Sequence, residues 1–274
     1  MFDTVIEMLS YPFMTRAFLV GSLVALCSAL LGVSLVLKRY SMIGDGLSHV
    51  GFGAMAIAAA MNAAPLTVAI PVVIVAAILL LRISGNAKIK GDAAIALIST
   101  TSLAVGVMVI SLTTGMNTDV YNYMFGSILA MSAEDVKLSL VLSVFVLILF
   151  IAFYHKIFAI TFDETFARAT GVKAGVYNTL IAVLTAVTIV LGMRMMGALL
   201  ISSLIIFPAL TSMRVCRTFK SVIINAAVIS VVCLIAGVTL SYVAATPAGA
   251  SVVLANLVMM VLYTVVGAVK NHMR

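Results

Sequence analysis

The stretch Met42–Met61 reads MIGDGLSHVGFGAMAIAAAM, and it sets the class to which this chain belongs. Asp45 and His49 stand four positions apart in it, just over one helical turn, so both side chains project from one helix face. The rest of the stretch is uncharged. A carboxylate at the centre of a membrane helix costs roughly 2.5–3.5 kcal/mol, so such residues usually mark a pathway or a binding site.

The composition indicates an integral membrane protein. The chain has 274 residues, of which 64% are hydrophobic and 9% are charged, whereas a soluble domain carries about 25% charged residues. The net charge of +7 does not indicate nucleic-acid binding, because the basic residues fall between apolar runs, as topology signals do. We expect no cleavable signal peptide, since the chain starts with Asp3 and Glu7 instead of a basic region.

The chain is predicted to be an all-α polytopic membrane protein with eight or nine transmembrane helices in one domain, residues 1–274. The candidate spans are Ala17–Leu37, Ile43–Met61, Leu66–Leu81, Ala93–Leu112, Val136–Tyr154, Val176–Met193, Gly197–Met213, Val222–Ala244 and Ser251–Val269. The segment Asp119–Met131 is too short to cross and is interpreted as a re-entrant or interfacial piece.

The charges predict the orientation, because cytoplasmic loops collect Lys and Arg. With nine spans and an outer N-terminus, most of the 16 basic residues lie inside and the C-terminus is cytoplasmic. The inner residues are Lys38, Arg39, Arg82, Lys88, Lys90, Lys156, Arg168, Lys173, Arg214, Arg217, Lys220, Lys270 and Arg274. Arg16, Lys137 and Arg194 fall outside.

The most polar long connection is His155–Gly175, a cytoplasmic segment in this topology. Phe162, Phe166 and Ala169 recur at helical spacing, which predicts a short amphipathic helix that Gly171 ends. Its charged residues are Asp163, Glu164, Arg168 and Lys173. The segment is either a docking helix for a cytoplasmic partner, with aromatic anchors, or a solvated loop on the membrane surface.

The chemistry of Asp45 and His49 points to a divalent transition metal. A carboxylate oxygen and an imidazole nitrogen both suit Zn²⁺, Mn²⁺ or Fe²⁺. One pair underfills a coordination shell, so we hypothesise a homodimer in which two copies supply two carboxylates and two imidazoles. The neighbouring small residues, such as Gly44 and Gly53, would permit close helix approach. The alternative is that Asp45 only hydrogen-bonds within the bundle and His49 satisfies it.

A second candidate is the span Gly197–Met213, which carries Pro208 in its interior. A proline there frees a backbone carbonyl and kinks the helix. The hydroxyl side chains that could satisfy this carbonyl are Ser202, Ser203, Thr211 and Ser212. The span is predicted to be either a flexing gate or pathway wall, or a helix with an ordinary proline kink.

Catalysis by this polypeptide is not expected. The sequence contains no GxxxxGK[ST] phosphate loop, no HExxH and no GxSxG. We expect no permanently bound cofactor, and any ATP hydrolysis would belong to a partner.

Five passages together resemble the permease subunits of ATP-binding-cassette importers for zinc, manganese and iron(II). They are LKRYSMIGDGLSHVGFG (Leu37–Gly53), DVYNYMFGSILAMSAED (Asp119–Asp135), FDETFARATGV (Phe162–Val172), MGALLISSLIIFPALTS (Met196–Ser212) and TPAGASVVL (Thr246–Leu254). The resemblance runs from Arg16 to about Leu257, and the last two passages are closer to the zinc permeases.

This resemblance implies a type II importer-like permease in a bacterial plasma membrane. It implies a homodimer that two cytoplasmic ATPase subunits drive and an extracytoplasmic metal-binding protein supplies. The family's intramembrane metal residues match Asp45 and His49, and its coupling helix matches Phe162–Val172. Zinc is the expected ion, followed by manganese and iron(II).

We expect transport by alternating access, weakening at acid pH because His49 must be neutral to bind a metal. Three other functions remain open at this point. They are a permease for a bulkier chelate such as cobalamin or a siderophore, an ion-gradient-driven secondary metal transporter, and a membrane scaffold that transports nothing.

Overall fold

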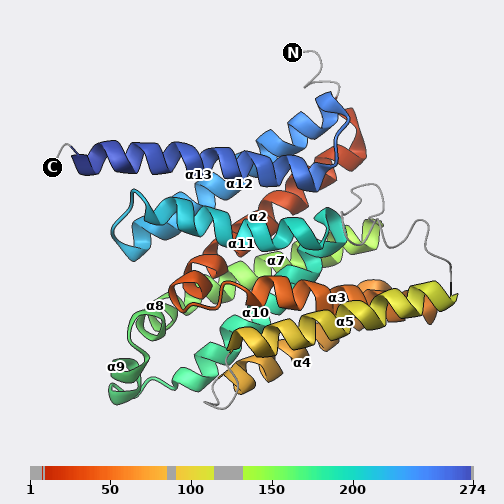
Figure 1. Cartoon of the computed structure of the whole chain (residues 1–274), viewed down its shortest axis with the longest axis horizontal. Coiled ribbons are helices and arrows are strands. Elements are labelled where there is room, and N and C mark those ends of the chain that lie inside the picture. The colour runs from red at the N-terminus through yellow and green to blue at the C-terminus, as the bar shows by residue number, and fades with distance from the viewer. Residues whose placement is uncertain (1–7, 9, 85–90, 114–131, 273–274) are drawn as a thin grey trace.

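The computed structural model describes residue 8 and residues 10–84, 91–113 and 132–272, and every regular element in these ranges is an α-helix (Figure 1). The helices are α2 (Pro12–Leu37), α3 (Ile43–Ala60), α4 (Pro65–Ser84), α5 (Gly91–Thr113), α7 (Ala133–Ala152), α8 (Tyr154–Phe162), α9 (Glu164–Ala169), α10 (Ala174–Met196), α11 (Ala198–Met213), α12 (Phe219–Ala244) and α13 (Ala248–His272). The predicted piece Asp119–Met131 lies outside the described residues.

The predicted spans are confirmed with one refinement. Within the described ranges, 8 helices are long and apolar enough to cross a membrane. The remaining predicted span, Gly197–Met213, corresponds to α11. Its apolar part, Leu200–Met213, is shorter than a full span. Local signals set several helix ends. Ser132 and Thr218 cap α7 and α12 by accepting hydrogen bonds from backbone amides three residues on.

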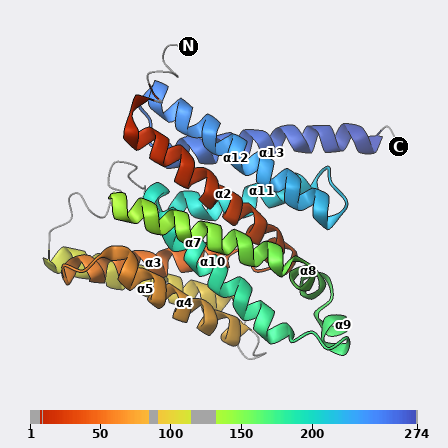
Figure 2. The same ribbon diagram turned by 180° about the vertical axis from the view of Figure 1, so that it is seen from behind.

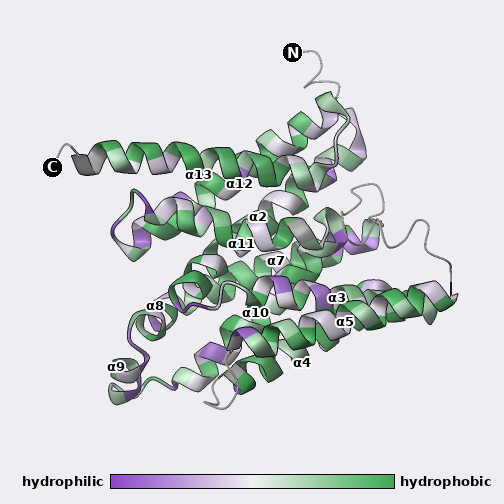
Figure 3. Ribbon diagram, viewed as in Figure 1, coloured by the Kyte–Doolittle hydropathy of each residue, from purple (hydrophilic) through white to green (hydrophobic). Residues whose placement is uncertain are grey.

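The helices pack as two groups that α10 connects (Figures 1 and 2). One group is α3 with α4 and α5, and the other is α11, α12 and α13 with α2. Helix α10 contacts α4 in the first group and α2 in the second, and α3 also contacts α11. Hydrophobic residues cover most of the long helices, and hydrophilic residues gather around α8 and α9 and at helix ends (Figure 3).

Close backbone approach fixes the positions of α2, α3, α5 and α11. A Cβ atom on Gly32 of α2 would overlap the carbonyl oxygen of Ile205 in α11. A Cβ atom on Gly53 of α3 would lie 2.7 Å from the carbonyl oxygen of Ser102 in α5. Only glycine permits such contacts without displacing the neighbouring helix.

Candidate functional site

Asp45 and His49 lie on one face of α3, as their spacing predicts. The Oδ2 atom of Asp45 is 3.7 Å from Nε2 of His49. The side chain of Asp45 is 39% exposed and that of His49 is 20% exposed. Helix α3 as a whole is the most enclosed of the 8 candidate spans in the described ranges, with 72% of its residues buried. The pair is therefore an accessible polar spot on an otherwise enclosed helix.

Neither side chain is occupied by another hydrogen bond in the described part of the chain. A separation of 3.7 Å is too long for a hydrogen bond between the two. The hydroxyl of Ser48 donates to the backbone oxygen of Asp45 at 2.7 Å and leaves the carboxylate free. Asp45 lies in the first turn of α3, where the helix dipole favours a negative charge. No hydrogen bond to the Asp45 carboxylate is seen among the described residues.

One chain supplies only part of a metal shell. Among the described residues, no group of three or more His, Cys, Asp or Glu side chains comes together. Structural zinc sites use four protein ligands, and catalytic zinc sites use three protein ligands plus a water. The pair needs donors from outside these residues to enclose an ion.

The small residues of α3 permit close helix approach, as predicted, and within one chain the approaching helices are α5, α10 and α11. The atoms that an added Cβ would meet belong to Ile205 for Gly44, Ile95 for Gly46, Met193 for Gly51 and Ser102 for Gly53. These neighbours lie on α11, α5 and α10. The sequence showed that close contacts would form but not which helix would make them.

Helix α11 packs against the first turn of α3. A Cβ atom on Gly44 would lie 3.1 Å from Cδ1 of Ile205, and the buried Pro208 follows Ile205 by about one turn. Ser202 and Ser203 line a pocket of about 500 Å³, together with Met196 and the start of α13. The structure thus brings the predicted gate helix beside the helix of the Asp45–His49 pair.

The hydroxyl groups predicted to satisfy the carbonyl freed by Pro208 are not all used for that. Ser212 instead donates to the backbone oxygen of Val222 at 2.9 Å and so joins α11 to α12. The hydroxyl of Thr211 is buried and has no hydrogen-bond partner in the described residues. Helix α11 continues through Pro208 as one element.

The polar segment His155–Gly175 contains two helices where one was predicted. The backbone leaves the helical region at Asp163, whose carboxylate accepts a hydrogen bond from the Phe166 amide at 2.8 Å and caps α9. This cap separates Phe162, at the end of α8, from Phe166. The buried position of α9 is Ala167, whereas Ala169 is exposed. The predicted single apolar face of Phe162, Phe166 and Ala169 is therefore wrong.

Gly171 ends α9 as predicted. It has a φ angle of +84°, and its amide donates to the oxygen of Arg168 at 3.0 Å. The amide of Val172 donates to Ala167 at 2.9 Å, which completes a Schellman turn.

Aromatic side chains are exposed on this segment. Phe166 is 65% exposed and Phe162 is 58% exposed. Phe162 belongs to a cluster, because its ring centre lies 5.0 Å from that of Phe158 and 5.7 Å from that of Phe219. Large exposed aromatic groups outside the spanning segments are typical of a protein interface.

Glu164 is held by three neighbours, and their contact with it was not predicted from the sequence. Its Oε2 atom accepts hydrogen bonds from Lys38 and Asn178, both at 3.0 Å, and Oε1 accepts one from Arg168 at 2.6 Å. Partial burial alone would raise the pKa of Glu164. The hydrogen bonds from Asn178, Lys38 and Arg168 and the charge of Lys38 outweigh it and lower this pKa to about 2.

Lys38 and Asn178 are the polar residues that the sequence analysis missed. Lys38 had been interpreted only as a topology signal, and Asn178 is a lone amide in an apolar run. A second missed contact is the ion pair between Arg194 and Asp135, 3.6 Å apart, which joins the end of α10 to the start of α7. The position of a polar residue next to an apolar run was the only sequence signal for either.

Comparison with known proteins relates the whole chain to metal transport. The profile of the ABC 3 transport family matches residues 10–267. The zinc uptake membrane protein ZnuB of Haemophilus influenzae is 30% identical over 90% of this chain and 94% of its own length. The manganese transport membrane protein MntC of Halalkalibacterium halodurans is 28% identical over 90% of this chain and 85% of its own length.

A solved structure has the same fold. The structure of PsaBC from Streptococcus pneumoniae in complex with Fab matches with a TM-score of 0.86 and 26% identity. The match covers 95% of this chain and 94% of the other. Sequence and structure thus agree over nearly the full length.

Proposed function

Because this chain belongs to the ABC 3 transport family and is a multi-pass permease for metal import, we propose that it carries zinc, with manganese as the second candidate. The relatives include both a zinc and a manganese system. The preference for zinc is supported by the passages Met196–Ser212 and Thr246–Leu254, which resemble zinc permeases.

The observation that carries the proposal is the 3.7 Å separation of two free, accessible ligand atoms on Asp45 and His49. Two ligands about 2.1 Å from one ion are about 3.4 Å apart in a tetrahedral shell and about 3.0 Å apart at a right angle in an octahedral one. Both values are somewhat shorter than the observed separation, so a small movement of the two side chains would place both ligands on one divalent ion. A second copy of the chain would complete four ligands with its own carboxylate and imidazole.

Partners are expected on both sides of the membrane. We propose that Phe162 and Phe166 on the α8–α9 segment dock on a cytoplasmic ATP-hydrolysing subunit, with the C-terminus on the same side. An extracytoplasmic binding protein would deliver the ion to the opposite mouth. ATP-driven displacement of α9 would then open the bundle inward, and the Ser202–Ser203 helix with Pro208 would form part of the gate.

The test is metal uptake by the complex of permease, ATPase and binding protein reconstituted in vesicles. We expect Asp45→Ala and His49→Ala each to lower zinc uptake at least tenfold, because each removes a ligand. The matched control is Asp92→Ala, which removes an exposed carboxylate from the first turn of α5. Uptake at the normal rate by folded Asp45→Ala would overturn the site.

Two further arms of the same assay test the ion and the energy source. Excess zinc should suppress manganese uptake more strongly than excess manganese suppresses zinc uptake. Uptake should also require ATP. An ion gradient that sustains uptake without ATP would instead identify a secondary transporter.

A further inference from the structure

Helix α9 is attached to the rest of the chain mainly through charge. Of its residues Glu164–Ala169, Ala167 is the buried one. Apolar packing therefore contributes little to holding this helix in place. Glu164 makes the polar contacts between α9 and distant helices. It accepts hydrogen bonds from Lys38 at the end of α2 and from Asn178 on α10.

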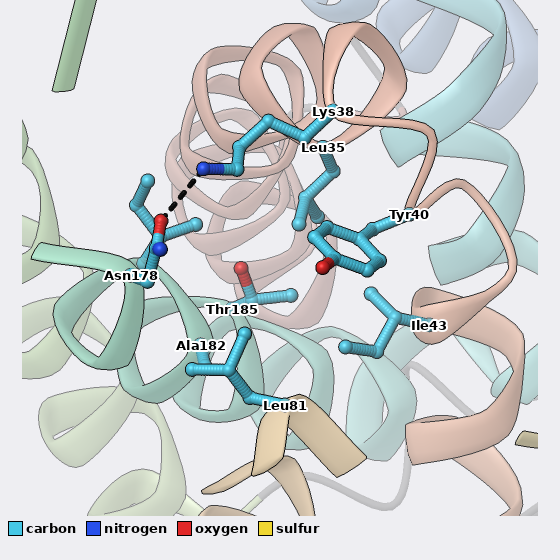
Figure 4. A pocket seen from close by; sticks show the side chains of 9 residues that line it. Leu35, Lys38, Tyr40, Ile43, Leu81, Asn178, Ala182 and Thr185 are labelled. Atoms are coloured by element: carbon cyan, nitrogen blue, oxygen red, sulfur yellow. Dashed lines mark hydrogen bonds between the residues drawn. The ribbon is translucent and has the colours of Figure 1, made fainter. Parts of the chain in front are cut away.

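Lys38 is enclosed and fully bonded. Its side chain is 11% exposed, and its ammonium group donates to the backbone oxygen of Ile160 at 3.1 Å, to Glu164 at 3.0 Å and to Asn178 at 2.7 Å. These contacts use all three N–H donors of a lysine. Figure 4 shows Lys38 reaching from the end of α2 to Asn178 on α10.

Asn178 completes a closed triangle. Its amide nitrogen donates to Oε2 of Glu164 at 3.0 Å, while its amide oxygen accepts from Lys38. We call Lys38, Glu164 and Asn178 the charged triad. Each member bonds both of the others, and the three come from the end of α2, from α9 and from α10. Loss of Glu164 leaves the enclosed ammonium of Lys38 without a charged partner, and loss of Lys38 or Asn178 removes two of the three bonds, so the three groups hold one another in place.

A tight turn connects the triad to the ligand helix. After Lys38 the chain closes α2 with hydrogen bonds from Arg39 to Val36 at 3.1 Å and from Tyr40 to Leu35 at 2.8 Å. Arg39 has a left-handed φ of 62°, an uncommon conformation for a residue with a side chain, and it turns the chain sharply between the two helices.

The same turn continues directly into α3. The amide of Ile43 donates to Tyr40 at 3.1 Å, and Asp45 is in the first turn of the helix that starts there. The pocket between this turn, α4 and α10 holds only about 20 Å³, close to one water molecule (Figure 4). The side of the turn that faces α4 and α10 therefore has little room to deform, and we expect a displacement of Lys38 along this side to be passed to α3.

We propose that Lys38 is a coupling residue: through the charged triad it transmits movement of α9 to the Asp45–His49 pair. This inference rests on the proposed function. Lys38 touches no transported ion; it positions the ligand helix relative to the helix that docks on the ATPase. Loss of Lys38 uncouples ATP hydrolysis from transport. Hydrolysis by the ATPase and metal binding by the Asp45–His49 pair continue, while fewer ions are transported per ATP.

The experiment measures ions transported per ATP hydrolysed in the reconstituted complex, with the substitution Lys38→Met. We expect the ATPase to remain bound and active while the ratio falls at least tenfold. The matched control is Lys156→Met, which removes an exposed ammonium from α8 and should leave the ratio unchanged. An unchanged ratio in Lys38→Met would overturn the proposal.

A double variant tests whether Lys38 acts through Glu164. The variant Lys38→Met with Glu164→Gln should lose no more than Lys38→Met alone, because the first change already breaks the link. Losses that multiply would show independent roles and would contradict the triad. Lys38→Arg, which keeps the charge and N–H donors, should recover a large part of the ratio.

Two additions keep the result interpretable. If Lys38→Met does not reach the membrane, Asn178→Ala replaces it, because this variant removes two hydrogen bonds and no charge. We expect the same drop in ions transported per ATP. An unchanged ratio would again overturn the proposal. Wild-type complex that transports no metal would contradict the proposed function. Wild-type complex that transports metal, beside an equally coupled Lys38→Met, would contradict the coupling role alone.

Discussion

Helices α3 and α9 are held in opposite ways. Helix α3 is 72% buried, and its glycines bring it against the backbones and side chains of three neighbours. Helix α9 buries Ala167 and is otherwise tied down by Glu164 and its cationic and amide partners. A helix fixed by shape keeps two ligand atoms at a set separation. A helix fixed by a charged network can move as a unit with a partner.

The largest expected effect comes from breaking the shape of α3. Gly53→Leu places a side chain against the Ser102 carbonyl oxygen, 2.7 Å from the added Cβ, and we expect a loss of about 3 kcal/mol or more in the free energy of unfolding. The control is Gly175→Leu on α10, where an added Cβ meets no atom within 4 Å. This control should change stability by about 0.5 kcal/mol at most. Equal thermal stability of the two variants in detergent would refute packing by shape.

The next effect is on partner binding by the α8–α9 segment. Phe166 is 65% exposed, so Phe166→Ala should leave folding intact and weaken ATPase binding by about 2 kcal/mol, roughly thirtyfold. Thr165→Ala, at an exposed neighbouring position, is the control. The measurement is titration of the purified permease with the ATPase subunit. Unchanged affinity in Phe166→Ala, or in Phe166→Ala combined with Glu164→Lys, would remove the docking role.

The charged attachment of α9 should respond to acid, unlike the packing of α3. The pKa of Glu164 is lowered from 4.5 to about 2, so its contribution is complete above about pH 4.5 and is lost as the pH falls toward 2. The chain has no tryptophan, so Thr165→Trp provides a single fluorescent reporter on α9. Its emission should stay constant from neutral pH to about pH 5 and change below pH 4.5. The same reporter in Glu164→Gln should show no such transition, and a transition there would assign it to another group.

The smallest effect concerns the end of α9. Gly171→Ala places a Cβ at a φ of +84° but meets no atom within 4 Å, so the cost is conformational, about 1 kcal/mol. Hydrogen exchange at the Val172 amide, which is bonded to Ala167, should become about fivefold faster. Exchange at an unchanged rate would mean that the left-handed turn does not limit the opening of α9.

The transmembrane helices could be predicted from the sequence because long apolar runs have few alternatives in a membrane. Each predicted span corresponds to one helix, from Ala17–Leu37 for α2 to Ser251–Val269 for α13. The break at Asp163 was missed, because the Phe162–Phe166 spacing fits a continuous helix equally well. A capping side chain competes with helix propagation at that point, and spacing alone does not register it.

The candidate site was predictable in part for the same physical reason. Asp45 and His49 are related by a local helical spacing, so their common face followed from the sequence. The triad joins Lys38 to Glu164 and Asn178 across more than a hundred positions, and only the packing of α2 against α8 and α10 brings them together. Likewise, the glycines of α3 predicted close helix contacts, but they did not predict which helices would make them.

The most direct test of the central claim is the metal stoichiometry of the purified complex at saturating zinc, measured in the permease after the binding protein is removed. The account predicts one tightly held zinc ion for every two chains, lost in both Asp45→Ala and His49→Ala and kept in Asp92→Ala. A full ion per chain, or an ion retained by Asp45→Ala, would contradict a site shared by two copies.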